Sequence, residues 1–265
     1  MQKWVASWLW GVALSAGAIM AAPQTAQIPA GPTEVQSLKS LVQIFNDSNS
    51  QPATFDNAVE QFQQQFPHSS RMIPVLVLAV RYHRLRREFL PELRYGVAAL
   101  RLDPHDLYVM SSLGQAIPDN VSPSDLNVEQ LLTQAEGYDQ QVLAAVQGFQ
   151  ITPGGLDFAG IHYSETNAHR LSDNLAGPAY ISLGAIAMLR QQYPAAASAY
   201  RKALTYQPDA GTQAQTYYHI GAAEAAAHQN DAAKADLAKA RSLAPSSQLL
   251  QRLIQAEEAK LSGGN

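Results

Sequence analysis

The sequence predicts an all-α fold, a solenoid of helix-turn-helix pairs with an irregular insertion near its centre. The main observation is a repeat, because residues 179–208 and 216–245 match each other at a fixed offset of 37 positions. A unit that recurs on this scale cannot bury its apolar face alone and stacks on copies of itself. The second observation is that the chain has no cysteine. Its stability must therefore come from a packed core, which stacked helices provide.

Each unit of the repeat has the residue pattern of two packed helices. Tyr180, Leu183 and Ala187 have helical spacing and share one face of a first helix. Gly184 has no side chain, which lets a neighbouring helix approach its backbone closely. Pro208 ends the second helix, because proline cannot continue one. The matched pairs are Tyr180 with Tyr217, Leu183 with Ile220, Gly184 with Gly221, Ala196 with Ala233, Tyr200 with Leu237, Ala203 with Ala240 and Pro208 with Pro245.

The succession of an aromatic residue, Leu-Gly, Ala, an aromatic residue or Leu, Ala and a closing Pro resembles the tetratricopeptide repeat (TPR). The offset of 37 positions exceeds the usual repeat length of about 34 residues, and we expect the extra residues in the linker 209–215. The resemblance implies that residues 177–245 form two TPR-like repeats. It also implies a scaffold for protein–protein interactions, without identifying the partner.

Residues 1–21 have the pattern of a secretory signal peptide. Lys3 is followed by seventeen uncharged residues, Trp4–Met20, and then by small residues. We therefore expect cleavage after Ala21, a periplasmic location, and a flexible linker over residues 22–36. The apolar run is slightly shorter than a comfortable membrane span, and an uncleaved inner-membrane anchor is the alternative.

Residues 37–150 are predicted to hold degenerate TPR-like repeats. Residues 73–104 end in an Ala-Leu pair and a Pro with the spacing of the repeat described above. Gly114 lies where the next unit would place its glycine, but Pro118 disrupts that unit. The second helix of the disrupted unit is expected to end near Gly137. The periodicity thus weakens toward the centre of the chain.

Residues 151–176 do not match the repeat and are predicted to be an irregular insertion. Within residues 151–173, a continuous helix would place four potential metal ligands on one face: His162, Glu165, His169 and Asp173. Imidazole and carboxylate groups so arranged are suited to a divalent metal such as Zn²⁺. Their spacing differs from the His-Glu-x-x-His pattern of metalloproteases. The alternative, which we favour, is that these side chains hydrogen-bond the insertion's own backbone or cap the next helix.

The C-terminal residues and the composition limit the remaining possibilities. Residues 246–261 place apolar side chains on one face of a helix, and we expect this helix to cap the last repeat. The net charge of −4 and the absence of a basic domain argue against nucleic-acid binding. The chain has neither a phosphate-binding loop nor a Gly-x-Ser-x-Gly turn. We therefore expect no cofactor, no resident metal and no enzymatic activity.

The TPR resemblance also implies a binding surface. In that family, ligands lie in a concave groove lined by the first helices, and three of its positions carry the largest side chains here: Ile181, Met188 and Tyr218. The full set is Pro178, Ile181, Ala185, Met188, Leu189, Gln215, Tyr218, Ala222, Ala225 and Ala226. The surface lacks the Lys, Asn and Arg set with which some members clamp a terminal carboxylate. The alternative is that these faces simply pack against a neighbouring helix.

A second candidate surface is basic. Arg81 and Arg84 take the corresponding groove positions in the first copy, and residues 71–103 contain seven Arg against three acidic residues. Guanidinium groups on one helical face are suited to binding carboxylate or phosphate groups. The alternative, which we favour, is a solvated face whose charges pair locally with Glu88 and Glu92.

Together, these features predict an exported TPR-type scaffold that binds a protein or peptide segment of a bacterial cell-envelope complex. A membrane would be contacted only through an uncleaved signal segment. The alternative function is an enzyme or metal-binding protein with its site in residues 151–173.

Overall fold

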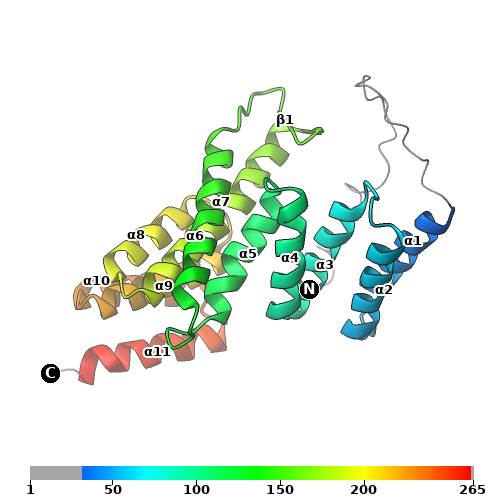
Figure 1. The fold of residues 1–265 in the computed structure, drawn as a ribbon. Helices are drawn as coiled ribbons and strands as arrows, with labels where there is room; N and C mark the ends of the chain where they lie inside the picture. The colour runs from blue at the N-terminus through cyan, green and yellow to red at the C-terminus, as the bar shows by residue number, and fades with distance from the viewer. Residues whose placement is uncertain (1–31, 264–265) are drawn as a thin grey trace.

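The computed structural model describes residues 32–263, and the predicted signal peptide and most of the predicted linker lie outside this range. The described part is built from helices and one small hairpin (Figure 1). The helices are α1 (Pro32–Asn46), α2 (Pro52–Gln65), α3 (Met72–Arg86), α4 (Phe89–Leu102), α5 (Leu107–Asn120), α6 (Val128–Gln147), α7 (Glu165–Leu189), α8 (Tyr193–Leu204), α9 (Ala210–Ala226), α10 (Asn230–Leu243) and α11 (Gln248–Gly263). The strands are β1 (Leu156–Phe158) and β2 (Ile161–Tyr163).

Successive helices form five pairs that follow one another across the molecule, from α1–α2 at one end to α9–α10 at the other (Figure 1). The first helix α5 also contacts the first helices of both neighbouring pairs, α3 and α7. The final helix α11 packs on α9 and α10. This arrangement confirms the prediction of an all-α helical solenoid. None of the described helices has the length and apolar character needed to cross a membrane.

Close glycine contacts hold the last two pairs together as the sequence predicted. A Cβ atom added to Gly184 would overlap the ring of Tyr200 on α8. A Cβ atom added to Gly221 would lie 2.8 Å from Cγ of Leu237 on α10. Only glycine allows helices to approach this closely without displacing the facing side chain.

The turns inside three pairs share one backbone geometry. Arg87, Gln191 and His228 follow α3, α7 and α9 in the left-handed conformation, with φ of 59°, 58° and 59°. In each turn the next amide donates to the carbonyl five residues earlier, as from Gln192 N to Ala187 O at 2.8 Å. This is the bond of a Schellman motif, which satisfies carbonyls at a helix end. The repeat thus extends to the turns, although none of the three carries the usual glycine.

The central insertion is shorter than the sequence predicted. The hairpin β1–β2 projects beyond the ends of α6 and α7 (Figure 1). Helix α7 begins at Glu165, so residues 165–176 are helical rather than irregular. Gly177 and Pro178 suggested a break, yet Pro178 lies inside α7 and removes only one backbone donor. Helix α6 likewise continues well past Gly137.

The apolar core runs along the whole array. The largest cluster joins α1–α6 and includes Phe55, Phe62, Tyr82 and Leu113. A smaller cluster of Met110, Val142, Leu175 and Ala179 fastens α7 to α5 and α6. Two further clusters fill the α7–α8–α9 region and the space between α10 and α11. Continuous packing of this kind holds the first helices side by side and so fixes the surface that they form.

Candidate binding groove

A groove of about 300 Å³ lies where α5, α7 and α9 meet the connection between α8 and α9. Its wall contains Asp173, Asn174, Gly177, Pro178 and Ile181 of α7. The remaining lining residues are Gln115 of α5, residues 206–209 of the connection, and Thr212, Gln215, Thr216 and His219 of α9. The side chains recur at helical spacing on α7 and α9, so each helix turns one face toward the groove.

The α7 wall presents polar groups without internal partners. Among the described residues, no hydrogen-bond donor contacts the half-buried Asp173 carboxylate. Burial raises the pKa of Asp173, and nearby His169 lowers it in part. Asn174 is exposed beside it. Because Pro178 has no N–H, the helical bond that the Asn174 carbonyl would accept from residue 178 is missing. Helix α7 therefore offers the Asp173 carboxylate to the groove, and its backbone bonding is interrupted beside it.

The opposite wall is held in place by bonds of its own. Asp209 caps α9, because its Oδ1 accepts from Thr212 N at 2.8 Å and its Oδ2 accepts from Thr212 Oγ1 at 2.5 Å. These bonds lower the pKa of Asp209. The buried Gln207 side chain accepts from Thr216 Oγ1 at 2.8 Å. Since these groups are already paired, they shape the groove rather than offer bonds to a ligand.

His219 and Tyr206 supply the ring surfaces of the groove. The imidazole of His219 is exposed and stacks on the Tyr200 ring, with centroids 5.2 Å apart. The protein around it nevertheless desolvates this ring enough to lower its pKa. The Tyr206 ring stacks on Tyr180 at a centroid distance of 5.8 Å. A neutral imidazole and aromatic faces make this wall a suitable contact for flat or cationic groups.

The predicted partner-binding residues have different surroundings. Ile181 lines the groove. Met188 packs against the core cluster formed by α7, α8 and α9, and Tyr218 packs against the cluster shared with α11. Both side chains are half-buried. Their role in binding stays a prediction.

The two arginines of the predicted basic surface contact other residues of the protein. Arg84 donates to the Glu92 carboxylate at 3.2 Å, to the Ser112 carbonyl at 3.0 Å and to Gln115 Oε1 at 2.8 Å. The half-buried Arg81 places its guanidinium over the Phe45 ring, 5.8 Å from the centroid. Whether either residue also binds a partner stays a prediction.

Helical spacing is the signal that could have located the groove from sequence. Asn174, Pro178 and Ile181 have the spacing of one helical face, as do Thr212, Gln215, Thr216 and His219. The family positions found Pro178, Ile181 and Gln215 among these. Asp173 and Asn174 were missed as groove residues because they precede the repeat and fell within the predicted insertion. His219 was missed because it lies one residue beyond the family position at Tyr218.

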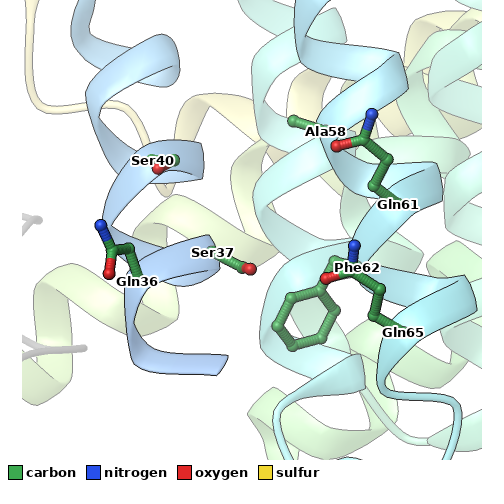
Figure 2. Close-up of a pocket in the computed structure, with 7 residues that line it drawn as sticks. All are labelled: Gln36, Ser37, Ser40, Ala58, Gln61, Phe62 and Gln65. Carbon is green, nitrogen blue, oxygen red and sulfur yellow. The ribbon is translucent and has the colours of Figure 1, made fainter. Parts of the chain in front are cut away.

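A second hollow of about 310 Å³ lies between α1 and α2 (Figure 2). Its lining is mainly amide and hydroxyl groups around one aromatic ring: Gln36, Ser37, Ser40, Ala58, Gln61, Phe62 and Gln65. These neutral groups provide no charge that would select a ligand. We therefore treat the groove at α5, α7 and α9 as the candidate site.

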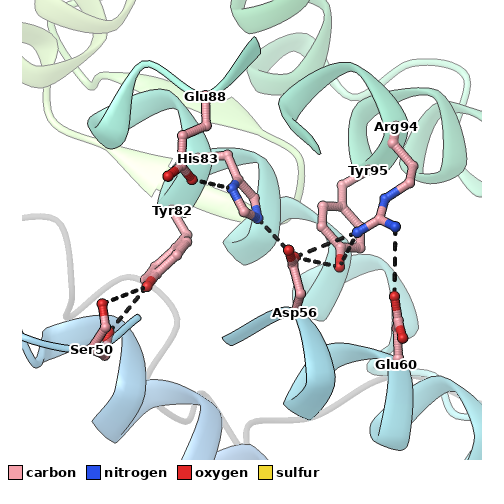
Figure 3. A network of polar contacts seen from close by, with 8 residues as sticks. All are labelled: Ser50, Asp56, Glu60, Tyr82, His83, Glu88, Arg94 and Tyr95. Atoms are coloured by element: carbon pink, nitrogen blue, oxygen red, sulfur yellow. Dashed lines mark hydrogen bonds and ion pairs between the residues drawn. The ribbon is translucent and has the colours of Figure 1, made fainter. Parts of the chain in front are cut away.

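A buried polar network joins α2, α3 and α4 (Figure 3). His83 is fully buried, with Nδ1 at 2.7 Å from Glu88 Oε2 and Nε2 at 3.0 Å from Asp56 Oδ1. Tyr95 donates to the same Asp56 oxygen at 2.7 Å, and burial raises the pKa of Tyr95. Arg94 lies 3.5 Å from Asp56. The bonds of this network hold three helices together.

The four potential metal ligands of the insertion do not share one helical face. His162 lies on β2, where its Nδ1 is 2.8 Å from Asp157 Oδ1 on β1. Glu165, His169 and Asp173 follow on α7. In residues 32–263, no three His, Asp or Glu side chains are grouped closely enough to hold a metal ion. The metal-site hypothesis required one continuous helix, which is not formed because the hairpin ends at Tyr163 and the helix starts after it.

Comparisons with known proteins find matches among solved structures. No protein-family model matches the chain, and no curated protein matches it. Four chains of solved structures match. One is the crystal structure of a thermophilic TPR protein from Thermus thermophilus, at 16% sequence identity and a TM-score of 0.45. The match covers 85% of this chain and 99% of that chain.

Proposed function

We propose that the protein is an exported, non-catalytic TPR-type scaffold that binds an extended segment of a partner protein in its groove. The observation that carries this proposal is the row of polar groups on α7 and α9, which lie on rigid helices around a preformed hollow. The Asn174 and Gln215 amides can each both donate and accept, as a peptide backbone requires. Pre-organised groups of this kind bind a segment without a large ordering cost in the protein.

The location in the cell envelope rests on the sequence of residues 1–21. A basic start, an apolar run and small residues are typical of a signal peptide, so we propose a periplasmic protein acting in a cell-envelope complex. An inner-membrane anchor is the alternative. N-terminal sequencing of the protein recovered from cells distinguishes them, because cleavage removes residues 1–21 and anchoring retains them.

The alternative function, an enzyme or metal protein with its site in residues 151–173, gains no support from a specific observation. The hairpin separates His162 from the helical Glu165 and His169. The Asp157–His162 pair is exposed to solvent at the tip of the hairpin, with side chains 87% and 62% exposed. An exposed ion pair of this kind contributes little to stability. Solvent also reaches it freely, whereas an active site usually excludes water.

Site-specific photo-crosslinking in living cells tests the scaffold proposal. A photoreactive amino acid replaces Ile181 in the groove, and in a matched control it replaces the exposed Ser198 of α8. We expect a discrete crosslinked partner from position 181 that position 198 does not give. Equal products from both positions, or none from either, would contradict the proposal.

A further inference from the structure

We infer that the groove selects a segment with a cationic side chain, Arg or Lys, and that the Asp173 carboxylate holds this side chain. The inference deepens the proposed function and rests on it, because it specifies the chemistry of the segment that the groove binds. It is carried by the Asp173 carboxylate, which receives no hydrogen bond from the described residues, and by the charges around it.

Asp173 differs from the other carboxylate in the groove. Asp209 receives two bonds from Thr212 and is committed to capping α9. Asp173 receives none from the described residues, although it is half-buried. Removing a carboxylate from water without giving it a partner is unfavourable. A guanidinium or ammonium group beside Asp173 would offset this cost through a charge-assisted hydrogen bond.

The neighbouring acceptor strengthens the same preference. The Asn174 carbonyl lacks its helical donor because residue 178 is proline. A carboxylate beside a carbonyl that has lost its usual helical donor suits a group with several N–H donors and a positive charge. The Tyr206 ring in the connection offers a face on which a guanidinium can stack.

No positive side chain of the described residues competes for this position within the lining, which contains neither Lys nor Arg. Arg84 contacts Gln115 from outside the groove, and its charge is paired with Glu92. Lys202 lies over the ring of Tyr180 at 5.6 Å. His169, on the same helix, lowers the pKa of Asp173 in part. The lining is therefore acidic, and it disfavours a segment that presents a carboxylate there.

The inference is tested with a positional-scanning library of synthetic peptides and the purified full-length chain. Wild type is compared with Asp173→Asn, which keeps the shape of the side chain and removes its charge. The matched control is Asp157→Asn, which removes one charge from the exposed hairpin. We expect wild type to prefer Arg or Lys over Glu by about tenfold at one peptide position, as one charge-assisted bond provides.

In Asp173→Asn, this preference falls about fivefold or more while binding of the remaining peptide persists. Asp157→Asn keeps the wild-type preference. Enriched peptides without a basic preference, or a preference that Asp173→Asn retains, would overturn the inference and leave the proposed function intact. If no peptide is enriched by wild type, both the inference and the proposed function fail.

Discussion

Asp139 of α6 occupies the place that an apolar side chain fills in the last two helix pairs. Those pairs press a Tyr or Leu side chain onto the glycine of the first helix, whereas α5–α6 presses the Asp139 carboxyl onto Gly114. The carboxyl is fully buried, and neither oxygen has a hydrogen-bond partner among residues 32–263. Ser182 lies nearby, but its hydroxyl donates to the Gly114 carbonyl at 2.6 Å. We predict that Asp139→Asn stabilises the protein at neutral and alkaline pH.

The direction of this change in stability follows from the titration of the buried Asp139 carboxyl. Burial raises the pKa of Asp139 well above its usual value, Glu136 adds to the rise, and Ser182 opposes it in part. The neutral carboxyl is therefore favoured in the fold, and its contribution to stability is lost as the pH rises through the raised pKa. Asn keeps the shape and cannot ionise. Asn leaves a polar group buried at the same place, so the gain comes only from removing the charge. A buried charged group without a hydrogen-bond partner costs more than a neutral one, by about 1 kcal/mol or more, and we expect Asp139→Asn to gain that much near pH 8 and little near pH 4.

Urea unfolding followed by circular dichroism across this pH range measures the difference in unfolding free energy between variant and wild type. The difference must grow with pH. Asp157→Asn, whose side chain is 87% exposed, reports the general effect of removing one negative charge. A difference for Asp139→Asn that stays constant with pH, or that follows the control, refutes the reasoning.

Three other substitutions have effects that the structure predicts. Gly184→Ala forces a methyl group into the Tyr200 ring, and we expect a loss of about 1–3 kcal/mol in urea unfolding; a neutral result would mean that the helices separate without cost. Burial and Glu224 raise the pKa of Asp236 to about 6, so wild-type stability should fall as the pH rises from about 4 to about 6. Asp236→Asn should flatten this slope, and an unchanged slope would contradict the assignment. Gln191→Gly removes the backbone strain of a left-handed residue. It should raise the free energy of unfolding by less than about 1 kcal/mol and the melting temperature slightly, whereas a lower melting temperature would argue against strain there.

The helix pairs of the C-terminal half could be predicted because their signals are local. Glycine, small residues and a closing proline recur at fixed positions, and each acts within one pair. The start of α7 could not be predicted from such signals, because Gly177 and Pro178 are typical of a break. The packing of Leu175 and Ala179 against α5 and α6 holds the helix across this point. Tertiary contacts thus outweigh one missing backbone bond.

The groove was only partly predictable for a related reason. Ile181 follows from the family position, but the surroundings of Asp173 depend on a helix whose start the sequence did not reveal. Met188 and Tyr218 share the helical spacing of a groove residue, yet the structure packs both against core clusters. Spacing identifies the face of a helix, and the depth of burial on that face depends on the neighbouring helices. Export and the partner-binding roles stay predictions.

The departures from the repeat pattern gather at one place. Asp139 replaces an apolar side chain in the α5–α6 pair, and Pro178 interrupts the backbone bonds of α7. Both lie next to the junction where Ser182 of α7 bonds Gly114 of α5. Each departure makes the array less stable than the regular repeat would be, and in natural proteins such local costs concentrate at functional sites. Gln115 and Ile181 of the groove lie next in sequence to Gly114 and Ser182, so this junction borders the groove and agrees with our proposal that the groove binds the partner.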